Sequence, residues 1–414
     1  MDKELILLRI TGEDRPGLTA SVMNVLAKYG ANIQDIGQAD IHSTLSLGIL
    51  IQVDEENSGR VMKDLLFKAS ELGIAIRFYP VTLEEYEEWV SRQGKNRYIL
   101  TLLGRKLSAH QIEEVTMFIA KHGLNIDSIR RLTGRESIMN PKHTERSCIE
   151  FSVRGLIADK AELQKELMSL CSKMGSEDEG VDCSFQVDDM YRRMRRLICF
   201  DMDSTLIQAE VIDELARRHG VYDQVSAITE SAMRGEIDFK ESFTKRCALL
   251  KGLDVKVMQD IAENLPFTEG VDRLMYVLKK YGYKIAILSG GFTFFGEYIQ
   301  KKYGIDYVYA NELEVDDTGH LTGRYVGEIV DGHRKAELLR LIAQVEKVDL
   351  AQTIAVGDGA NDLPMLALAG LGIAFHAKPR VVANAKQAIS TIGLDGVLYF
   401  LGFKDSYLDE RGRM

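Results

Sequence analysis

Residues 197–205 read LICFDMDST. Leu197–Phe200 is a continuous apolar run, which is typical of a buried parallel strand, and Asp201 and Asp203 follow it directly. In open α/β sheets, ligands bind in the crevice outside the carboxyl ends of the strands. Two carboxylates this close together repel each other unless a cation or a shared proton relieves the repulsion. The stretch therefore predicts a metal site at the edge of a parallel sheet.

Polar residues recur downstream in the same setting. Ser289–Gly291 (SGG) and Gly357–Asp362 (GDGAND) each follow an apolar run, and Asp331–Lys335 (DGHRK) opens a helix between them. Apolar runs that alternate with helical stretches predict a Rossmann-like, doubly wound parallel sheet over residues 195–414. The fold class expected for this part of the chain is α/β.

DxDxT, Ser, Lys and GDGxND in this order resemble the haloacid dehalogenase superfamily of aspartyl phosphotransferases. The resemblance implies that Asp201 is a nucleophile that becomes phosphorylated and that Asp203 is the general acid and base, with Ser289 and Lys335 completing the catalytic set. The residues implied on the phosphate side are Ser289, Gly290, Gly291, Lys335 and Asn361.

The residue types suit phosphoryl transfer in their own right. A carboxyl-phosphate intermediate needs an oriented carboxylate, which Asp201 can supply. Asp203 would protonate the leaving alkoxide, and because an ordinary Asp has a pKa of about 3.9, its site must raise that value. Mg²⁺ prefers hard oxygen ligands and shares them with phosphate. By the resemblance, its ligands are Asp201, the backbone carbonyl of Asp203 and Asp358, with Asp362 in support.

Residues 208–282, between the first two motifs, are largely helical by period and predict a cap over the crevice. Glu210, residues 233–239 (MRGEIDF) and residues 246–253 (RCALLKGL) resemble the phosphoserine phosphatases. The resemblance implies that Arg246 binds the substrate carboxylate and Glu210 its ammonium group, in keeping with their charges. Taken without the resemblance, both residues also fit a solvated helix face. The implied apolar wall of this site is Met233 and Phe239.

The first half of the chain contains an internal repeat. Residues 6–36 and 99–129 align without a gap and share Ala-Lys, Gly, Asn-Ile and Ile toward their ends. Each copy reads as strand, helix and strand, and the pattern that follows predicts a two-layer βαββαβ domain with both helices on one sheet face. The predicted division is two such α+β domains at 1–82 and 97–190, with a linker at 83–96 that begins as a short helix.

The repeated unit resembles the ACT domain, a module that binds amino acids at paired interfaces. A helix start preceded by Pro16 and Gly17 can accept a ligand carboxylate, although a plain turn fits equally well. The residues of this effector loop would be Asp14, Arg15, Pro16, Gly17 and Leu18. The resemblance implies an amino acid effector such as serine and a homodimer formed through the ACT-like domains. The second copy has Arg105–Ala109 at this place, without the Pro-Gly pair, and is expected to serve mainly as a pairing surface.

Composition narrows the class of protein. The 414 residues include 52 Lys and Arg and 62 Asp and Glu, a net charge of −10, and no long basic block, so no nucleic-acid partner is expected. No apolar stretch approaches the roughly 18 residues of a membrane span, and no secretory signal is visible, so a cytoplasmic protein is expected. The five Cys are scattered without a CxxC pair, which predicts reduced thiols rather than a disulfide framework or a zinc site.

Together these features predict a Mg²⁺-dependent enzyme that hydrolyses O-phospho-L-serine to L-serine and phosphate, the last step of L-serine biosynthesis. One alternative is a phosphatase of another small phosphorylated metabolite or of phosphoprotein. An alternative of another class is an amino-acid-sensing regulatory protein with an inactive catalytic half, against which the intact set of motifs argues.

Overall fold

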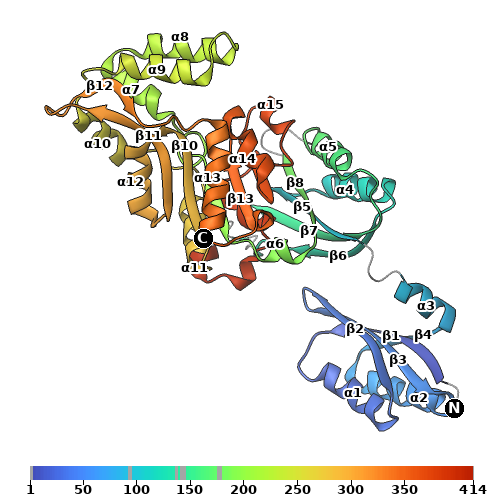
Figure 1. The fold of residues 1–414 in the computed structure, drawn as a ribbon. Coiled ribbons are helices and arrows are strands. Elements are labelled where there is room, and N and C mark those ends of the chain that lie inside the picture. Colours follow the sequence, from blue (N-terminus) through green and yellow to red (C-terminus); the bar gives the residue numbers. More distant parts are fainter. Residues whose placement is uncertain (1–2, 92–95, 136–138, 140–145, 175–179, 414) are drawn as a thin grey trace. The chain divides into compact units, whose positions relative to one another are not determined.

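The structure is a computed structural model that describes residues 3–91, 96–135, 139, 146–174 and 180–413. The chain divides into two compact units, residues 1–95 and 96–414 (Figure 1). Residues 92–95 of the predicted linker lie outside the described residues, as do residues 136–138 and 140–145 within the second predicted domain.

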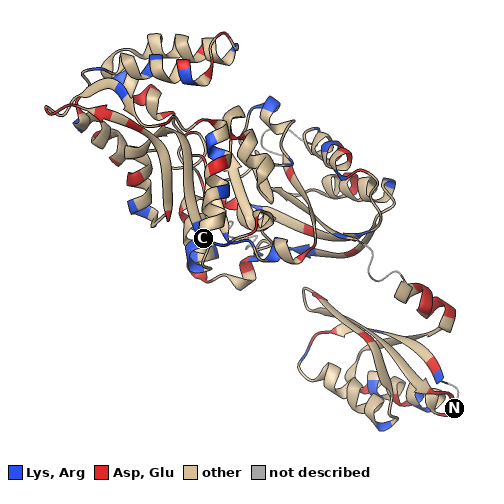
Figure 2. Ribbon diagram, viewed as in Figure 1, with Lys and Arg blue, Asp and Glu red and all other residues tan. Residues whose placement is uncertain are grey.

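The first unit is a two-layer α+β sandwich. Its elements are β1 (Lys3–Glu13), α1 (Leu18–Lys28), β2 (Asn32–Ile41), β3 (Thr44–Asp54), α2 (Glu55–Leu72) and β4 (Ala75–Val81). The antiparallel sheet has the order β2-β3-β1-β4. Val22 of α1 and Leu65 of α2 share one buried cluster with the strands, so both helices cover the same sheet face, as predicted. The expected short linker helix is α3 (Leu83–Ser91), which carries four Glu and no Lys or Arg (Figure 2).

The second unit begins with a copy of the same sandwich. Its elements are β5 (Arg97–Gly104), α4 (Ala109–Lys121), β6 (Asn125–Arg131), β7 (Ser147–Arg154), α5 (Lys160–Cys171) and β8 (Val181–Val187). The strand order β6-β7-β5-β8 matches that of the first unit position by position. The internal repeat read from the sequence is therefore a repeat of the fold.

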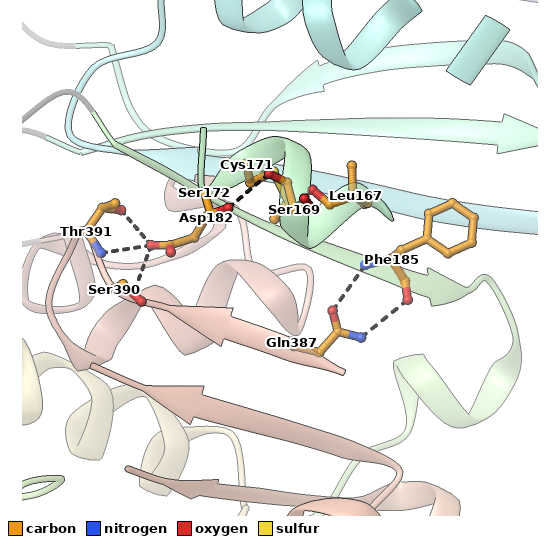
Figure 3. Close-up of a disulfide and its surroundings, with 10 residues drawn as sticks. Leu167, Ser169, Cys171, Ser172, Asp182, Phe185, Gln387, Ser390 and Thr391 are labelled. Carbon is orange, nitrogen blue, oxygen red and sulfur yellow. Dashed lines mark hydrogen bonds between the residues drawn. A yellow bond between two sulfur atoms is a disulfide. The ribbon is translucent and has the colours of Figure 1, made fainter. Parts of the chain in front are cut away.

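The sandwich of the second unit contains a disulfide that the sequence did not predict. Cys171 ends α5 and Cys183 lies on β8, with their Cα atoms 6.7 Å apart, and the two sulfur atoms are bonded (Figure 3). The expectation of reduced thiols is wrong for this pair, because α5 packs back onto β8 and brings two cysteines without a CxxC spacing together. Cys148, Cys199 and Cys247 are free and buried, as expected.

The remainder of the second unit is built on a seven-stranded sheet. Its strands are β9 (Leu197–Phe200), β10 (Lys284–Phe292), β11 (Tyr307–Val315), β12 (Leu321–Val326), β13 (Thr353–Gly357), β14 (Leu371–Phe375) and β15 (Gln387–Ile389). The order is β12-β11-β10-β9-β13-β14-β15, and all neighbours are parallel except the antiparallel edge strand β12. Residues 197–200 thus form the central strand of this sheet.

The alternation of side chains along β9 explains why helices cover both faces of this sheet. Ile198 and Phe200 lie in one buried cluster with residues of α11 (Val271–Lys280) and α12 (Thr293–Tyr303). Leu197 and Cys199 lie in another, with residues of α13 (Gly332–Val345) and α14 (Leu363–Leu368). A strand that is buried on both faces needs a continuous apolar run, and this one supplies it. The predicted α/β fold with a doubly wound parallel sheet is confirmed.

The helices between β9 and β10 are α7 (Val211–His219), α8 (Tyr222–Met233), α9 (Phe239–Leu249), α10 (Val255–Glu263) and α11. Of these, α7, α8 and α9 extend from one end of the sheet (Figure 1). Helices α8 and α9 pack on each other and α9 on β12, whereas α11 packs on β10 and on the C-terminal helix α17 (Glu410–Arg413). The proposed boundaries of the domains and of a cap at residues 208–282 stay predictions.

The remaining elements are short. They are α6 (Met190–Arg193), α15 (Pro379–Val382), α16 (Val397–Phe400) and 3₁₀ turns at Leu350–Gln352, Ala360–Asp362, Leu394–Gly396 and Asp405–Tyr407. Among the helices of the described residues, none has the length and apolar character needed to cross a membrane.

Candidate active site

The carboxyl ends of three neighbouring strands bring the sequence motifs together. Asp201 follows β9, Ser289 lies on β10, and Asp358 follows β13, and both β10 and β13 pair with β9 in parallel. Parallel strands end at the same edge of a sheet, so their terminal residues converge there. The backbone N–H of Asp201 donates to the carbonyl of Val356 at 2.9 Å, which fixes the end of β9 against β13.

Lys335 lies at the centre of the converging carboxylates. It comes from the first turn of α13 and is fully buried, and its Nζ is 2.9 Å from Asp201 Oδ1 and 2.7 Å from Asp362 Oδ1. Burial by itself lowers the Lys335 pKa, but the charges of Asp201 and Asp362 outweigh it and hold the pKa above its usual value. Lys335 is therefore a permanent cation beside Asp201.

Asp201, Asp358 and Asp362 form a cluster that suits a metal ion. One carboxylate oxygen from each lies within 4.8 Å of the others. Burial, followed by the charge of Asp201, raises the pKa of Asp358 to about 8 and that of Asp362 to about 7. These shifts mark negative charge that lacks full compensation, and an all-oxygen donor set is what Mg²⁺ or a similar hard cation prefers.

Asp362 is held from a second side. The backbone N–H of Gly359 donates to Asp362 Oδ2 at 2.9 Å. A side chain at Gly357 would place its Cβ 2.4 Å from an Asp362 carboxyl oxygen, so only glycine leaves room for this carboxylate. Asp362 is thus fully buried and bonded through both oxygens to the protein, which suits it for support of the cluster.

Asp203 lies apart from the three clustered carboxylates. Its Oδ1 accepts a hydrogen bond from the Val211 N–H at 3.1 Å, at the start of α7. A Cβ at Gly291 would be 2.4 Å from Asp203 Oδ2, so this carboxyl group lies against the Ser-Gly-Gly turn. Burial, and after it the charges of Glu210 and Asp201, raises the pKa of Asp203 well above its usual value. Asp203 therefore has the raised pKa that a proton donor needs near neutral pH.

The Ser289–Gly291 turn is braced by a residue to which the sequence assigned no role. The backbone N–H of Gly291 donates to the buried Ser289 Oγ at 2.9 Å. Asn311, buried on β11, donates from Nδ2 to the Gly290 carbonyl at 2.8 Å and accepts from the Val330 N–H at 2.8 Å. Asn311 thereby ties the turn to the segment that leads into α13. The available signal was a polar residue directly after the Tyr-Val-Tyr-Ala run of residues 307–310.

Arg246 and Glu210, which are expected to bind the organic part of the substrate, interact electrostatically with each other and with the aspartates of the site. Arg246 on α9 is half-buried, its Nη1 is 3.5 Å from Thr229 Oγ1, and its buried Nε has no hydrogen-bond partner among the described residues. Glu210 Oε1 accepts from Ser204 Oγ at 2.8 Å, and burial raises the Glu210 pKa. Opposite charges are thus available for an amino acid head group.

Phe239 and Met233, the two residues expected to form the apolar wall, differ in exposure, and Phe239 is the more buried of the two. Phe239 reaches the phosphate side, because a Cβ at Gly290 would be 3.1 Å from Phe239 Cζ. Met233 ends α8, is 64% exposed, and has its sulfur 3.9 Å from Lys378 Nζ. Asn361 lies against the start of α13, since a Cβ at Gly332 would be 2.6 Å from the Asn361 carbonyl oxygen. Of these three residues, Met233 is the one whose side chain is exposed.

A pocket of 530 Å³ lies beside Glu210. It lies between residues of the 204–210 loop and α7 on one side and residues 261–266 at the end of α10 on the other, and of the predicted site residues only Glu210 lines it. Its lining residues are Ser204, Gln208, Ala209, Glu210, Asp213, Glu214, Arg217, Arg218, Ile261, Asn264, Leu265 and Pro266.

Comparisons with known proteins match both parts of the chain. The ACT domain profile matches residues 4–79, and the profile of the haloacid dehalogenase-like hydrolases matches residues 198–367. The chain is 38% identical to the phosphoserine phosphatase of Streptomyces coelicolor and 37% identical to that of Mycobacterium tuberculosis, in each case over 97% of this chain and 93% of the relative. A crystal structure of a probable phosphoserine phosphatase from Vibrio cholerae, 33% identical, superposes with a TM-score of 0.55 over 75% of this chain and 89% of that one.

The match over nearly the full length of these relatives covers both ACT-like sandwiches as well as the seven-stranded sheet. The chain belongs to the phosphoserine phosphatase family, within the haloacid dehalogenase-like hydrolases, and carries an ACT domain at residues 4–79.

Proposed function

We propose that this protein hydrolyses O-phospho-L-serine to L-serine and phosphate through an aspartyl-phosphate at Asp201, the last step of L-serine biosynthesis. The observation that carries the proposal is the placement of Asp201 at the end of β9, 2.9 Å from the buried Lys335 ammonium and beside the Asp358–Asp362 pair. A carboxylate held by a fixed cation at a strand end is poised to attack a bound phosphoryl group.

Asp203 would manage the protons in both halves of the reaction. An Asp201 oxygen attacks phosphorus, the bond from phosphorus to the seryl oxygen breaks, and protonated Asp203 gives its proton to that oxygen. Water then attacks phosphorus, Asp203 takes the water proton, and the bond from phosphorus to Asp201 breaks. The raised pKa of Asp203 supports this role, because the first step needs the protonated form.

Lys335 and the Ser289–Gly291 turn would hold the phosphoryl oxygens. Lys335 offers a buried positive charge, and Ser289 offers a hydroxyl on a turn fixed by Asn311. Gly290 and Gly291 allow their backbone N–H groups to approach an anion closely. Donors that are held in place before the reaction need little reorganisation as charge develops.

The cofactor proposed is Mg²⁺. Asp201, the backbone carbonyl of Asp203 and Asp358 would hold the ion, and Asp362 would support them, since both of its oxygens already accept hydrogen bonds. When bound, the ion would neutralise charge between the nucleophile and the phosphoryl group.

Metal-free protein is expected to become less stable as the pH rises from about 5 to about 8. In the folded state the pKa of Asp362 is about 7 and that of Asp358 about 8, above their usual values. The folded state therefore binds more protons than the unfolded chain in this range, and the free energy of unfolding falls with pH. Mg²⁺ binds the deprotonated carboxylates, so its stabilising effect should be larger at pH 8 than at pH 6. Thermal unfolding in EDTA and in Mg²⁺ at both values measures this, and an equal shift at the two would contradict it.

Arg246 and Glu210 would select an amino acid phosphate, with Phe239 and Met233 as apolar wall. A guanidinium pairs with the substrate carboxylate and a carboxylate with its ammonium group. The buried Arg246 Nε without a partner among the described residues supports this, because a buried donor of this kind otherwise costs stability.

Arg246→Met is expected to raise KM for phosphoserine by roughly 10- to 100-fold, the range set by the loss of charge-assisted hydrogen bonds. Hydrolysis of O-phosphoethanolamine, which lacks the carboxylate, should change little. The matched control is Lys245→Met, one residue away on α9, whose ammonium pairs with Glu241 on the helix surface. Steady-state kinetics with both substrates measure this, and equal losses on the two would argue against a carboxylate contact.

The ACT-like domains are proposed to form a homodimer and to bind an amino acid effector such as serine. The edge strand β2 is exposed along its whole length, and its apolar residues Ile33, Ile36 and Ile41 are 41%, 48% and 79% exposed. In the effector loop, residues 14–17 are exposed, Leu18 is buried, and α1 begins after Gly17 without a side-chain cap. An exposed strand edge supports pairing, and open helix N–H groups support carboxylate binding.

The cytoplasmic location expected from the sequence stays a prediction.

Phosphate release from a panel of substrates, with and without Mg²⁺, tests the function. The panel contains phosphoserine, phosphothreonine, a phosphoserine peptide and sugar phosphates. The proposal expects the highest kcat/KM for phosphoserine and dependence on the metal. Preference for the peptide or a sugar phosphate would favour the alternative phosphatases, and no turnover of any of them would favour a regulatory protein.

A further inference from the structure

The second ACT-like sandwich is packed against the phosphatase sheet through buried polar contacts. Asp182 on β8 accepts hydrogen bonds at 2.9 Å from the N–H groups of Ser390 and Thr391, and at 2.6 Å from Thr391 Oγ1 (Figure 3). The Gln387 side chain of β15 pairs with both the N–H and the carbonyl of Phe185. These contacts fix the β8 edge of the sandwich to the last strand of the phosphatase sheet.

A buried ion network forms the next part of this contact. Arg273 of α11 binds Asp395 and Asp405, both at 2.7 Å. Two groups of the sandwich side join it, because Arg146 binds Asp395 at 2.7 Å and the Gly134 N–H donates to Asp405 at 2.8 Å. Buried charges that are paired on several sides hold their partners in one geometry, since removal of any one leaves another uncompensated.

The strand-to-helix loop of the second sandwich also reaches the phosphatase half. This loop, residues 105–108 between β5 and α4, is at the place that residues 14–17 take in the first sandwich. Arg105 Nη2 is 2.9 Å from Glu269 Oε2, and its Nη1 is 3.4 Å from Glu269 Oε1. In the first sandwich this loop is exposed to solvent. In the second sandwich the loop binds Glu269, a carboxylate of the same chain.

Glu269 belongs to a segment that touches the catalytic loop directly. We call residues 266–270 the hinge segment and residues 201–210 the catalytic loop. The Gln208 N–H donates to the Pro266 carbonyl at 2.8 Å, and the Thr268 N–H donates to the Leu206 carbonyl at 3.0 Å. The hinge segment is therefore bonded along one edge to the loop that carries Asp201, Asp203 and Glu210.

The other end of the hinge segment contacts Leu394 and Asp395, and Asp395 is the carboxylate that Arg146 of the sandwich side binds. The Leu394 N–H donates to the Glu269 carbonyl at 2.7 Å. Gly270 has a φ of +81°, and a Cβ there would be 2.3 Å from Asp395 Oδ1, so its backbone lies directly on the carboxylate that Arg146 binds. Direct contacts thus run without interruption from Arg105 and Arg146 to the catalytic loop.

We propose that the second ACT-like sandwich positions the catalytic loop through the hinge segment, with Arg105 and Arg146 as positioning residues. The inference rests on the proposed function of the catalytic loop. It assigns the second sandwich a role inside the chain, in place of binding an effector at residues 105–108. Loss of the Arg105–Glu269 pair would let the hinge segment shift and so misplace Asp203 relative to the leaving oxygen. Displacement of a reacting group by about 1 Å costs up to about a hundredfold in rate.

A charge swap in the full chain tests the proposal. Arg105→Glu and Glu269→Arg are each expected to lower kcat about tenfold while KM stays within about twofold, because the shift affects the reacting group more than binding. The double variant restores the ion pair and is expected to recover kcat to within about threefold of the unchanged protein. Thermal midpoints of the three variants should agree closely, since a partly exposed ion pair contributes little to stability.

Lys121→Glu is the matched control, because it breaks the ion pair with Glu166 inside the same sandwich, away from the hinge segment. It should leave kcat unchanged. Single variants with normal kcat, or a double variant that loses activity as the sum of the two, would overturn the proposal. If a single variant unfolds, the conservative Arg105→Gln is measured in its place, and normal kcat there also overturns it.

Each variant is assayed with phosphoserine and with p-nitrophenyl phosphate. If the unchanged protein hydrolyses only the second compound, the proposed substrate is wrong, while the kcat pattern of the swap still decides whether the sandwich positions the loop.

Discussion

Asp201→Asn is expected to lower kcat for phosphoserine by about four to six orders of magnitude, the loss typical of removing a nucleophile. The amide cannot form the acyl phosphate bond, and no other described carboxylate takes its place: Asp358 and Asp362 lie in the next loop, and Asp203 is bonded to the start of α7. Phosphate release with phosphoserine as substrate measures the loss.

The same variant should remain folded. Asn has the shape of Asp, and Lys335 keeps its 2.7 Å contact with Asp362. Asp317→Asn, at an exposed position in the turn between β11 and β12, is the control and should leave kcat within a few fold. An Asp201→Asn protein that is folded and retains a tenth of the activity would exclude Asp201 as the nucleophile.

Lys335→Met is expected to damage both stability and catalysis. It removes the cation between two buried carboxylates, Asp201 and Asp362, and breaking a buried pair costs about 3–5 kcal/mol. The cost should shrink at acidic pH, because protonation of the carboxyl groups removes the uncompensated charge. Loss of a fixed donor to the phosphoryl oxygens should lower kcat by about 10²–10³.

Urea unfolding at pH 7.5 and pH 5, together with kinetics in Mg²⁺, measures both effects. Arg340→Met, a change on the exposed face of the same helix, is the control and should alter neither quantity. A Lys335→Met protein with unchanged free energy of unfolding at pH 7.5 would show that the two carboxylates do not depend on this ammonium group.

The catalytic motifs could be predicted from the sequence because each of them occupies only a few consecutive residues. Leu197–Phe200 needed two buried faces and therefore had to be a central strand, and parallel pairing then brought Asp201, Ser289 and Asp358 to one edge. The repeat was visible for the same reason, since helix ends such as Gly30 and Gly123 recur at a fixed spacing. Periodicity and motif order thus predicted the elements and their order.

Long-range packing left no such signal. The sequence around Asp182 does not predict that this residue binds Ser390 and Thr391, more than 200 residues away. The Cys171–Cys183 disulfide depends on how α5 folds back on β8, and the brace at Asn311 depends on two loops that meet only in the folded chain. The exposure of Met233 likewise follows from where α8 ends. Each of these features is set by tertiary contacts rather than by residue type or spacing.

In the proposed reaction the phosphoryl group passes through Asp201. Rapid mixing with phosphoserine, acid quenching and borohydride reduction, followed by mass spectrometry of the digested protein, tests it most directly, because borohydride converts an aspartyl-phosphate to homoserine. Homoserine is expected at position 201, formed only in the presence of phosphoserine and absent from Asp201→Asn. Turnover without any modification at position 201, or homoserine at Asp203 or Asp358 instead, would contradict it.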